Sequence, residues 1–355
     1  GNIPVTTSRI EQYQLCGFGY LLQYVLGLKE EEYEYTNYDP RIAGSFTHAV
    51  LAELFERIRE DSGAFKVSKL PEYEKMVGDV VTEKERSWRR VNPVFFPPVW
   101  YGFLENCIGQ VSRFLRKEAD TFPEYTISAT EQSFSRVLNI LRMEEALEIK
   151  TGSRQGLPER IELRGRIDRL SRGENGFALV DYKTRRSLNK SDYIGTIDTL
   201  PTVYQLPLYI YLLEEGMEEQ QHSDPSLTSD QRGCRPAAHQ DDITVASRFD
   251  GEGLRVRTES SEETNAAPSD QPAHPNVASC SFYLLTEGKY EHLYRVNDTK
   301  AWVKTREGID ELIKTMFDQV RRLVRGIAEG DFRRPADECD GCAFRSVCRQ
   351  KYMLE

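Results

Sequence analysis

The chain has 355 residues, of which 39% are hydrophobic and 29% are charged, and its formal net charge is −10. This composition is that of a globular protein. No window approaches the roughly 18 uninterrupted apolar residues that a membrane span needs. The first residues, Gly1 to Pro4, lack the basic and apolar run of a secretory signal. We therefore expect a cytoplasmic protein with no membrane partner.

The cysteines and the distribution of charge bear on whether the protein binds a metal or a nucleic acid. Seven cysteines are an odd number for a disulfide framework, and their clustering near the C-terminus points to a metal instead. The acidic net charge argues mildly against nonspecific binding to nucleic acid. Basic residues nevertheless cluster at Arg164, Arg166 and Arg169, at Lys183, Arg185 and Arg186, and at Arg321, Arg322 and Arg325. For each cluster taken alone, a solvated surface is the more common explanation.

Helical spacing of apolar residues predicts three helices in the first third of the chain. They cover residues 8–28, the segment from Gly44 towards Arg59, and about 100–119. Cys16 lies on the apolar stripe of the first helix. In the second helix His48 shares one face with Leu51 and Phe55, so this face should turn His48 towards the core.

From residue 125 the pattern changes to short strands bounded by glycine, serine and proline. Strands are predicted over 125–134, 160–170 and 177–182 with a turn at 171–176, then a helix over 199–215, a hairpin of 281–285 with 290–296, and a long helix over about 305–329. The intervening Met217–Ser279 is rich in Ser, Asp, Gln, Pro and Glu, and Phe249 is its only aromatic residue. Such a segment cannot bury enough apolar surface to offset its ordering entropy, so we predict a flexible insertion.

The most informative stretch places two aspartates and a lysine at the ends of adjacent predicted strands. Asp168 ends one strand, and Asp181-Tyr-Lys183 follows the apolar run 177–180. Because side chains at i and i+2 share a face of a strand, Asp181 and Lys183 can point into one pocket with Asp168. For an Asp-x-Lys pair alone, a surface hairpin with ordinary charges would be the simpler explanation. Strand ends that leave an apolar core, however, are where site residues tend to lie.

Carboxylates in this arrangement suit a hard divalent cation. Mg²⁺ prefers oxygen ligands, so Asp168 and Asp181 can hold a cation that polarises a scissile phosphate and lowers the pKa of its water. Lys183 can then stabilise the developing negative charge or orient that water. The pattern therefore indicates phosphodiester hydrolysis that depends on a metal.

In the order and spacing of its motifs, the chain resembles the PD-(D/E)XK nuclease domains of the bacterial AddAB and RecBCD helicase–nucleases and of CRISPR adaptation exonucleases. The motifs are Ser8–Cys16, Gly44–His48, Gly165–Arg169, Asp181–Thr184, Gln205–Tyr209 and the C-terminal cysteines, which together cover nearly the whole chain outside the insertion. The resemblance implies an α/β fold with a restriction-endonuclease-like core, in which helices flank a central mixed sheet. It also implies that His48, Asp168 and Asp181 bind Mg²⁺ or Mn²⁺ and that Lys183 is catalytic.

Further positions near these motifs have two explanations each. His48 alone is more often a core histidine, and it is a softer ligand than Mg²⁺ prefers, but its place in the motif set favours a metal ligand. Gln205 and Tyr209 lie one helical turn apart, so both can support catalysis at the site, or the helix can simply pack on the sheet through its other residues. Glu131, in the middle of a strand, is either an additional acidic site residue or an exposed polar position.

The cysteine-rich tail predicts a metal site that joins the two ends of the chain. Cys339, Cys342 and Cys348 are separated by two and by five residues. A [4Fe–4S] cluster requires a fourth thiolate, and Cys16 is the natural candidate, a pairing that the resemblance also implies. A Cys₄ zinc site is the alternative. Gly17 stands where the family often has proline. The other cysteines, Cys107, Cys234 and Cys280, are predicted to lie in the core or in loops.

We expect one nuclease unit with four segments. They are an N-terminal helical part with Cys16 and His48 (1–124), the nuclease core (125–216), the flexible insertion (217–279), and a C-terminal hairpin, helix and cysteine-rich tail (280–355).

The leading hypothesis is an exonuclease acting on DNA ends, preferring single strands, in recombination or repair. The sequence has no Walker A motif, so this chain is not itself expected to be an ATP-driven helicase. A helicase subunit or domain is therefore the expected partner. The alternatives are a non-catalytic DNA-end-binding module stapled by metal, and an RNA-directed nuclease of the same fold.

Overall fold

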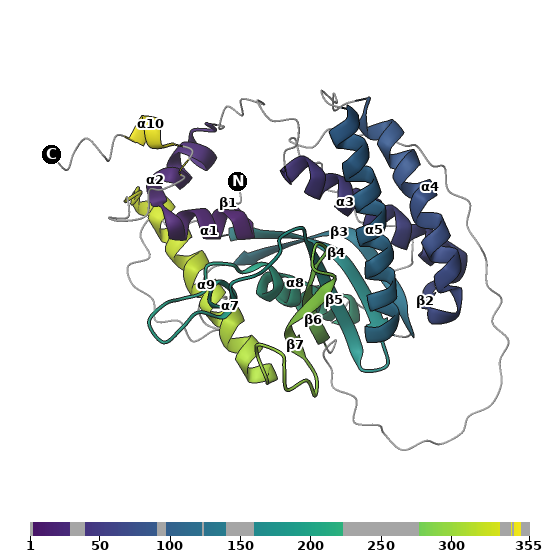
Figure 1. Ribbon diagram of the computed structural model, residues 1–355. Helices are drawn as coiled ribbons and strands as arrows, with labels where there is room; N and C mark the ends of the chain where they lie inside the picture. The colour runs from purple at the N-terminus through teal and green to yellow at the C-terminus, as the bar shows by residue number, and fades with distance from the viewer. Residues whose placement is uncertain are drawn as a thin grey trace, which may run out of the picture.

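The computed structural model describes residues 3–28, 40–90, 97–122, 124–139, 160–222, 277–333, 342 and 344–348. Within these residues a seven-stranded sheet lies at the centre and helices cover both of its faces (Figure 1). The strand order is β2-β3-β4-β5-β6-β7, and β1 pairs with β4. This arrangement confirms the predicted α/β class with a mixed sheet flanked by helices.

Most neighbouring strands are antiparallel, and two pairs, β1 with β4 and β5 with β6, are parallel. The strands are β1 (Ile3–Val5), β2 (Ala64–Lys66), β3 (Glu124–Asn139), β4 (Arg160–Gly173), β5 (Gly176–Lys183), β6 (Val277–Leu284) and β7 (Lys289–Arg295). β3, β4 and β5 are antiparallel neighbours, β5 and β6 are parallel, and β6 and β7 form a hairpin. The turn between β4 and β5 is shorter than the predicted 171–176, because Ser171 and Arg172 pair with β5 and the ladder closes at Gly173 and Gly176.

The predicted helices occur in the predicted order, and the first of them is broken. The helices are α1 (Thr7–Leu15), α2 (Gly17–Tyr20), a π-helix (Leu21–Val25), α3 (Pro40–Ser62), a 3₁₀ turn (Val67–Lys69), α4 (Leu70–Trp88), α5 (Pro97–Thr121), α7 (Lys190–Ile194), α8 (Gln205–His222), α9 (Arg306–Glu329) and α10 (Arg345–Cys348). Helix α4 and the short helices α7 and α10 were not predicted. The single helix predicted over 8–28 is broken at Cys16, whose backbone is extended and whose Sγ accepts a hydrogen bond from Gly19 N at 3.2 Å.

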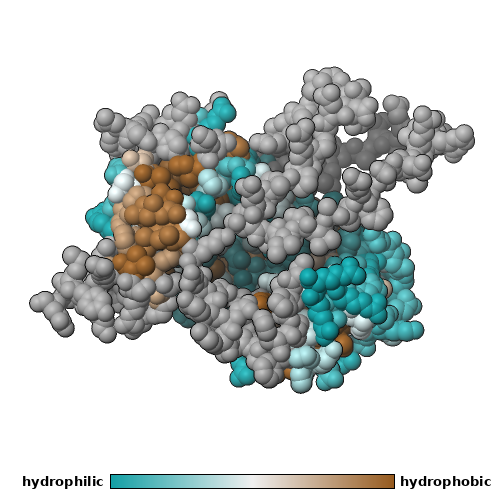
Figure 2. Space-filling view, turned by 90° about the horizontal axis from the view of Figure 1, so that it is seen from above, coloured by the Kyte–Doolittle hydropathy of each residue, from teal (hydrophilic) through white to brown (hydrophobic). Residues whose placement is uncertain are grey.

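Two hydrophobic clusters hold the helices against the two faces of the sheet. One contains the inner faces of α3, α4 and α5 with Val180 and Tyr182 of β5. The other contains α8, α9 and Ile10 of α1 with residues such as Leu179 on the opposite face of β5. Adjacent residues of β5 thus contribute to opposite clusters, as expected from strand geometry. Seen from above, apolar surface is concentrated on the side of α1 and α2, and the side of α4 and α5 is hydrophilic (Figure 2).

Arg169 contradicts the prediction that its basic cluster is a solvated surface. Its side chain is only 1% exposed, and its Nη2 lies 2.6 Å from Oε1 of the equally buried Glu118 on α5. Its Nη1 donates to the hydroxyl of Tyr125 at 3.1 Å, and its guanidinium lies 4.5 Å from the ring centre of Phe55. A charged side chain is tolerated in this core because it has a counter-charge and a hydrogen-bond acceptor.

Some predicted features lie partly or wholly outside the described residues. Helix α8 continues to His222 and β6 begins at Val277, so residues 223–276 of the predicted insertion are not described. Of the remaining cysteines, Cys107 and Cys280 are buried, as predicted, and Cys234 lies outside the described residues. None of the helices described is long and apolar enough to cross a membrane.

Candidate active site

A polar site forms where β4 and β5 separate in the middle of the sheet. The two strands stay paired up to Arg169 and Val180, and Asp168 and Asp181 are the next residues beyond this pair. Both aspartates are buried. Asp168 Oδ2 accepts a hydrogen bond from the backbone N–H of Tyr182 at 2.8 Å, which ties the diverging strands together. The divergence therefore brings the two predicted aspartates to one place on adjacent strands.

Glu131 adds a third carboxylate from β3. Its neighbours on each side pair with Arg169 and Ile167 of β4, so Glu131 lies opposite Asp168. Directly opposed residues of antiparallel strands project from the same face. Glu131 has a φ of 46°, in the left-handed region that side chains other than glycine rarely adopt. Of the two explanations given by the sequence, the structure thus favours a residue of the site.

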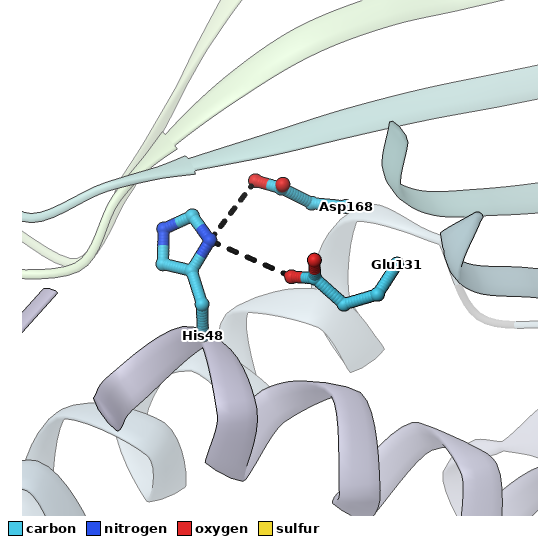
Figure 3. A group of neighbouring side chains, drawn as sticks. All are labelled: His48, Glu131 and Asp168. Carbon is cyan, nitrogen blue, oxygen red and sulfur yellow. Dashed lines mark ion pairs between the residues drawn. The ribbon is translucent and has the colours of Figure 1, made fainter. Parts of the chain in front are cut away.

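His48 of α3 points at these two carboxylates (Figure 3). Its Nδ1 lies 3.5 Å from Asp168 Oδ2 and 3.7 Å from Glu131 Oε1. On the other side of the ring, Nε2 lies 3.0 Å from the carbonyl oxygen of Tyr182. Because a carbonyl can only accept, Nε2 carries a proton, so Nδ1 is the nitrogen whose lone pair becomes available to a metal ion when the ring is neutral. A histidine held by its second nitrogen in this way is the usual arrangement for a metal ligand.

The pKa values of His48 and Asp181 reflect an excess of carboxylates in the site. Burial disfavours protonation of His48, but Asp168 and Glu131 beside it raise its pKa to about 10. Burial also raises the pKa of Asp181 to about 6, with Asp168 adding to the rise and Lys183 opposing it. A cation at the centre of the group would relieve both effects. Nδ1 of His48 and one oxygen each of Glu131 and Asp168 lie within 4.8 Å of one another, a set that fits one metal ion.

Lys183 occupies the other side of the site. Its Nζ lies 2.7 Å from Asp181 Oδ2 and donates to Gln205 Oε1 at 2.6 Å. Gln205 is the first residue of α8, and Tyr209 follows one turn later with its ring against Gly165 of β4. Burial raises the pKa of Tyr209, and the carboxylates of Asp181 and Asp168 raise it further. The helix that begins at Gln205 therefore approaches both Lys183 and the aspartates.

The structure divides the predicted residues into two adjoining groups. His48 and Asp168 lie together with Glu131, and Asp181 lies with Lys183 and Gln205. Among the described residues, Asp181 is not part of the three-residue metal group, because its carboxylate faces Lys183. Glu131 was not among the predicted ligands. Its acidic side chain was visible in the sequence, but the strand register that places it opposite Asp168 was not.

The segment that follows α9 passes beside Cys16. A Cβ atom on Gly17 would lie only 3.1 to 3.2 Å from backbone atoms of Phe332 and Arg333, so glycine at this position permits the close approach. The hydroxyl of Tyr13 also donates to the carbonyl of Asp331 at 2.7 Å. Of the tail cysteines, Cys348 is buried, Cys342 is partly buried, and Cys339 lies outside the described residues.

Comparison with known proteins identifies relatives along the whole chain. The family model of the PD-(D/E)XK nuclease superfamily matches residues 4–349. A subunit of the ATP-dependent helicase/deoxyribonuclease of Clostridium novyi (strain NT) is 24% identical over 97% of this chain and 30% of its own length. The corresponding subunit from Thermoanaerobacter sp. (strain X514) is 23% identical over 98% of this chain, again 30% of its own length. The chain therefore spans about 30% of the length of these relatives.

Proposed function

Because the chain belongs to the PD-(D/E)XK nuclease superfamily, we propose that it is a deoxyribonuclease that hydrolyses phosphodiester bonds at DNA ends with the help of Mg²⁺ or Mn²⁺. The observation that carries this proposal is the orientation of His48. Its Nε2 is held by the carbonyl of Tyr182, and its Nδ1 faces the carboxylates of Asp168 and Glu131. Among the described residues, Asp168 has an ion pair only with His48, and Glu131 has one with His48 and one with Arg166. Such a set suits a divalent cation.

In this proposal His48, Asp168 and Asp181 hold the metal, and Glu131 joins them. When bound, the cation would polarise the scissile phosphate and lower the pKa of the attacking water. A histidine ligand makes Mn²⁺ a good fit alongside Mg²⁺. Asp181 would have to share its carboxylate between the metal ion and Lys183, whose Nζ lies 2.7 Å from Oδ2.

Lys183 is proposed to act on the substrate. Its ammonium group is held by Asp181 and Gln205, so the charge is fixed in place before DNA arrives. A positive charge oriented in advance stabilises the negative charge that develops on the phosphate and can orient the attacking water. Gln205 then positions Lys183, and Tyr209 supports Gln205 and the strand at Gly165.

The names of the relatives extend the proposal to a biological setting. They describe subunits of an enzyme that is both an ATP-dependent helicase and a deoxyribonuclease. We infer that this chain provides the nuclease activity in DNA recombination or repair, alongside a helicase that delivers DNA ends, preferably as single strands.

The test is a cleavage assay with end-labelled single-stranded, double-stranded and circular DNA, and with RNA, in Mg²⁺, Mn²⁺ and EDTA. Linear single-stranded DNA should be degraded with either metal and be left intact in EDTA. Asp181→Asn and Lys183→Ala should abolish cleavage and leave DNA binding, measured by fluorescence anisotropy, largely intact. Lys300→Ala, which removes an exposed lysine outside the site, is the matched control and should cleave normally.

Each alternative gives a different result in this assay. Binding without cleavage by the wild-type protein in all metals would indicate a DNA-end-binding module. Preferential cleavage of RNA would indicate an RNA-directed nuclease, and cleavage of circular DNA would refute an exonuclease. Full activity in both site variants would refute the roles given to Asp181 and Lys183.

We further propose that Cys16, Cys339, Cys342 and Cys348 bind a [4Fe–4S] cluster. The close passage of the 332–333 segment beside Gly17 supports this proposal, because it brings the start of the cysteine-rich tail next to Cys16. The extended backbone of Cys16 breaks the N-terminal helix, so Cys16 lies between α1 and α2 and not within a continuous helix. A cluster there would join the two ends of the chain and stabilise both.

Metal analysis of anaerobically purified protein tests the cluster. About four irons per chain are expected for one cubane cluster. Cys16→Ala should lose iron and thermal stability, and Cys107→Ala, which alters a buried cysteine of the opposite core, should keep its iron. Stoichiometric zinc without iron would replace the cluster by a Cys₄ zinc site. Unchanged iron in Cys16→Ala would remove Cys16 from the ligand set.

A further inference from the structure

Glu11 of α1 is a carboxylate that the sequence motifs and the proposed reaction leave without a role. It is partly buried, and its Oε1 accepts a hydrogen bond from the backbone N–H of Tyr204 at 3.3 Å. The carbonyl of Tyr204 accepts the hydrogen bond of Leu208 N at 3.0 Å, which starts helix α8. Glu11 therefore contacts the chain one residue before Gln205, at the point where α8 begins.

The surroundings of Glu11 connect it to the lysine of the site. Gln205, next to Tyr204, accepts the hydrogen bond of Lys183 Nζ at 2.6 Å. Burial raises the pKa of Glu11, whereas the hydrogen bond from Tyr204 and the charges of Lys183 and Arg185 lower it. The Glu11 carboxylate is thus close enough to Lys183 to interact with its charge, although another helix carries it.

We propose that Glu11 is a positioning residue for Lys183, acting through the first residues of α8. By holding Tyr204 N it fixes where α8 begins, and so fixes the amide of Gln205 that receives the Lys183 ammonium. This inference rests on the proposed function only where it concerns cleavage, since the placement of Lys183 is a property of the folded chain.

A second hydrogen bond from the same helix provides a matched control. Gln14 Nε2 donates to the carbonyl of Pro201 at 2.8 Å, so it also ties α1 to the loop before α8. This bond reaches the loop three residues before Tyr204, and no described hydrogen bond or ion pair joins it to Lys183. Gln14 also hydrogen-bonds the Tyr204 hydroxyl, which shares the Pro201 carbonyl with it. Removing Gln14 therefore loosens the loop and the Tyr204 side chain but leaves Glu11 in place as the acceptor for the backbone N–H of Tyr204.

The experiment compares Glu11→Ala, Glu11→Gln and Gln14→Ala in the full chain. Glu11→Ala should lower kcat about tenfold at saturating DNA and metal, with little change in the half-saturating concentrations, because it misplaces a group that acts in the transition state. Glu11→Gln keeps an acceptor for Tyr204 N and should recover most of this loss. Gln14→Ala should retain the wild-type kcat.

Chemical labelling gives a readout that does not depend on cleavage. Acylation of Lys183 by acetic anhydride, followed by mass spectrometry, measures how tightly its amine is held, with the exposed Lys190 as internal reference. Glu11→Ala should raise the labelling rate of Lys183 relative to Lys190 by about threefold or more. Equal effects of Glu11→Ala and Gln14→Ala on kcat and labelling would overturn the proposal, as would a Glu11→Gln variant as impaired as Glu11→Ala. If the wild-type protein cleaves no nucleic acid, the proposed function fails and the labelling comparison alone decides the role of Glu11.

Discussion

Replacing Glu118 by glutamine would leave the guanidinium of Arg169 buried without a counter-charge. The two side chains are 1% and 0% exposed and lie 2.6 Å apart, so water cannot take the place of the carboxylate. Removing one partner of a buried ion pair typically costs about 3–5 kcal/mol. Because domains are stable by about 5–15 kcal/mol, this loss is a large part of the free energy of unfolding. The hydroxyl of Tyr290, which donates to Glu118, would keep an acceptor in the glutamine side chain.

Urea unfolding monitored by circular dichroism measures this loss. Glu118→Gln should lower the free energy of unfolding by about 3 kcal/mol or more. Glu83→Gln, the same substitution in a well-exposed pair with Arg57, should leave the transition unchanged. The double variant Glu118→Leu with Arg169→Met removes both charges and should be more stable than Glu118→Gln alone. A Glu118→Gln protein as stable as Glu83→Gln would refute the argument that the buried charge needs its partner.

Two further predictions concern the site. The pKa of His48 is about 10 against an ordinary 6.5, so its proton stabilises the metal-free fold fully below pH 6.5, and this contribution is lost as the pH rises through about 10. At about pH 8 His48 is protonated, and a bound metal ion must displace this proton from Nδ1. Calorimetric titration of Mn²⁺ in buffers of different ionisation enthalpy should therefore show release of about one proton per ion, and His48→Gln should show none. A Cβ on Gly165 would lie 2.9 Å from the ring of Tyr209, so Gly165→Ala should destabilise the fold by about 1–3 kcal/mol and slow cleavage. Gly109→Ala, where a Cβ has no neighbour within 4 Å, should do neither in the same unfolding and cleavage assays.

Local chemistry was enough to predict most of the elements. Helix α9 shows this well, because its apolar residues recur at helical spacing and its ends carry their own signals. Thr305 Oγ1 accepts from Gly308 N at the start, and Gly330 ends the helix with a φ of 67°. The β4–β5 hairpin was likewise predicted, although its turn was placed too broadly. Helix α4 was missed, and the N-terminal helix was predicted without its break at Cys16.

The motifs of the sequence by themselves determined the family and predicted the residues of the candidate site. They predicted Asp168, Asp181, Lys183 and His48 as site residues from spacing and resemblance, since each lies within a short recognisable segment. Tertiary structure alone decided how these residues are grouped. Glu131 lies opposite Asp168 only because of the register between β3 and β4. Arg169 is a core residue because α5 places Glu118 against it, and Glu11 reaches the start of α8 from a helix 193 residues earlier in the sequence. Such contacts depend on packing between distant segments, which the sequence of either segment does not specify.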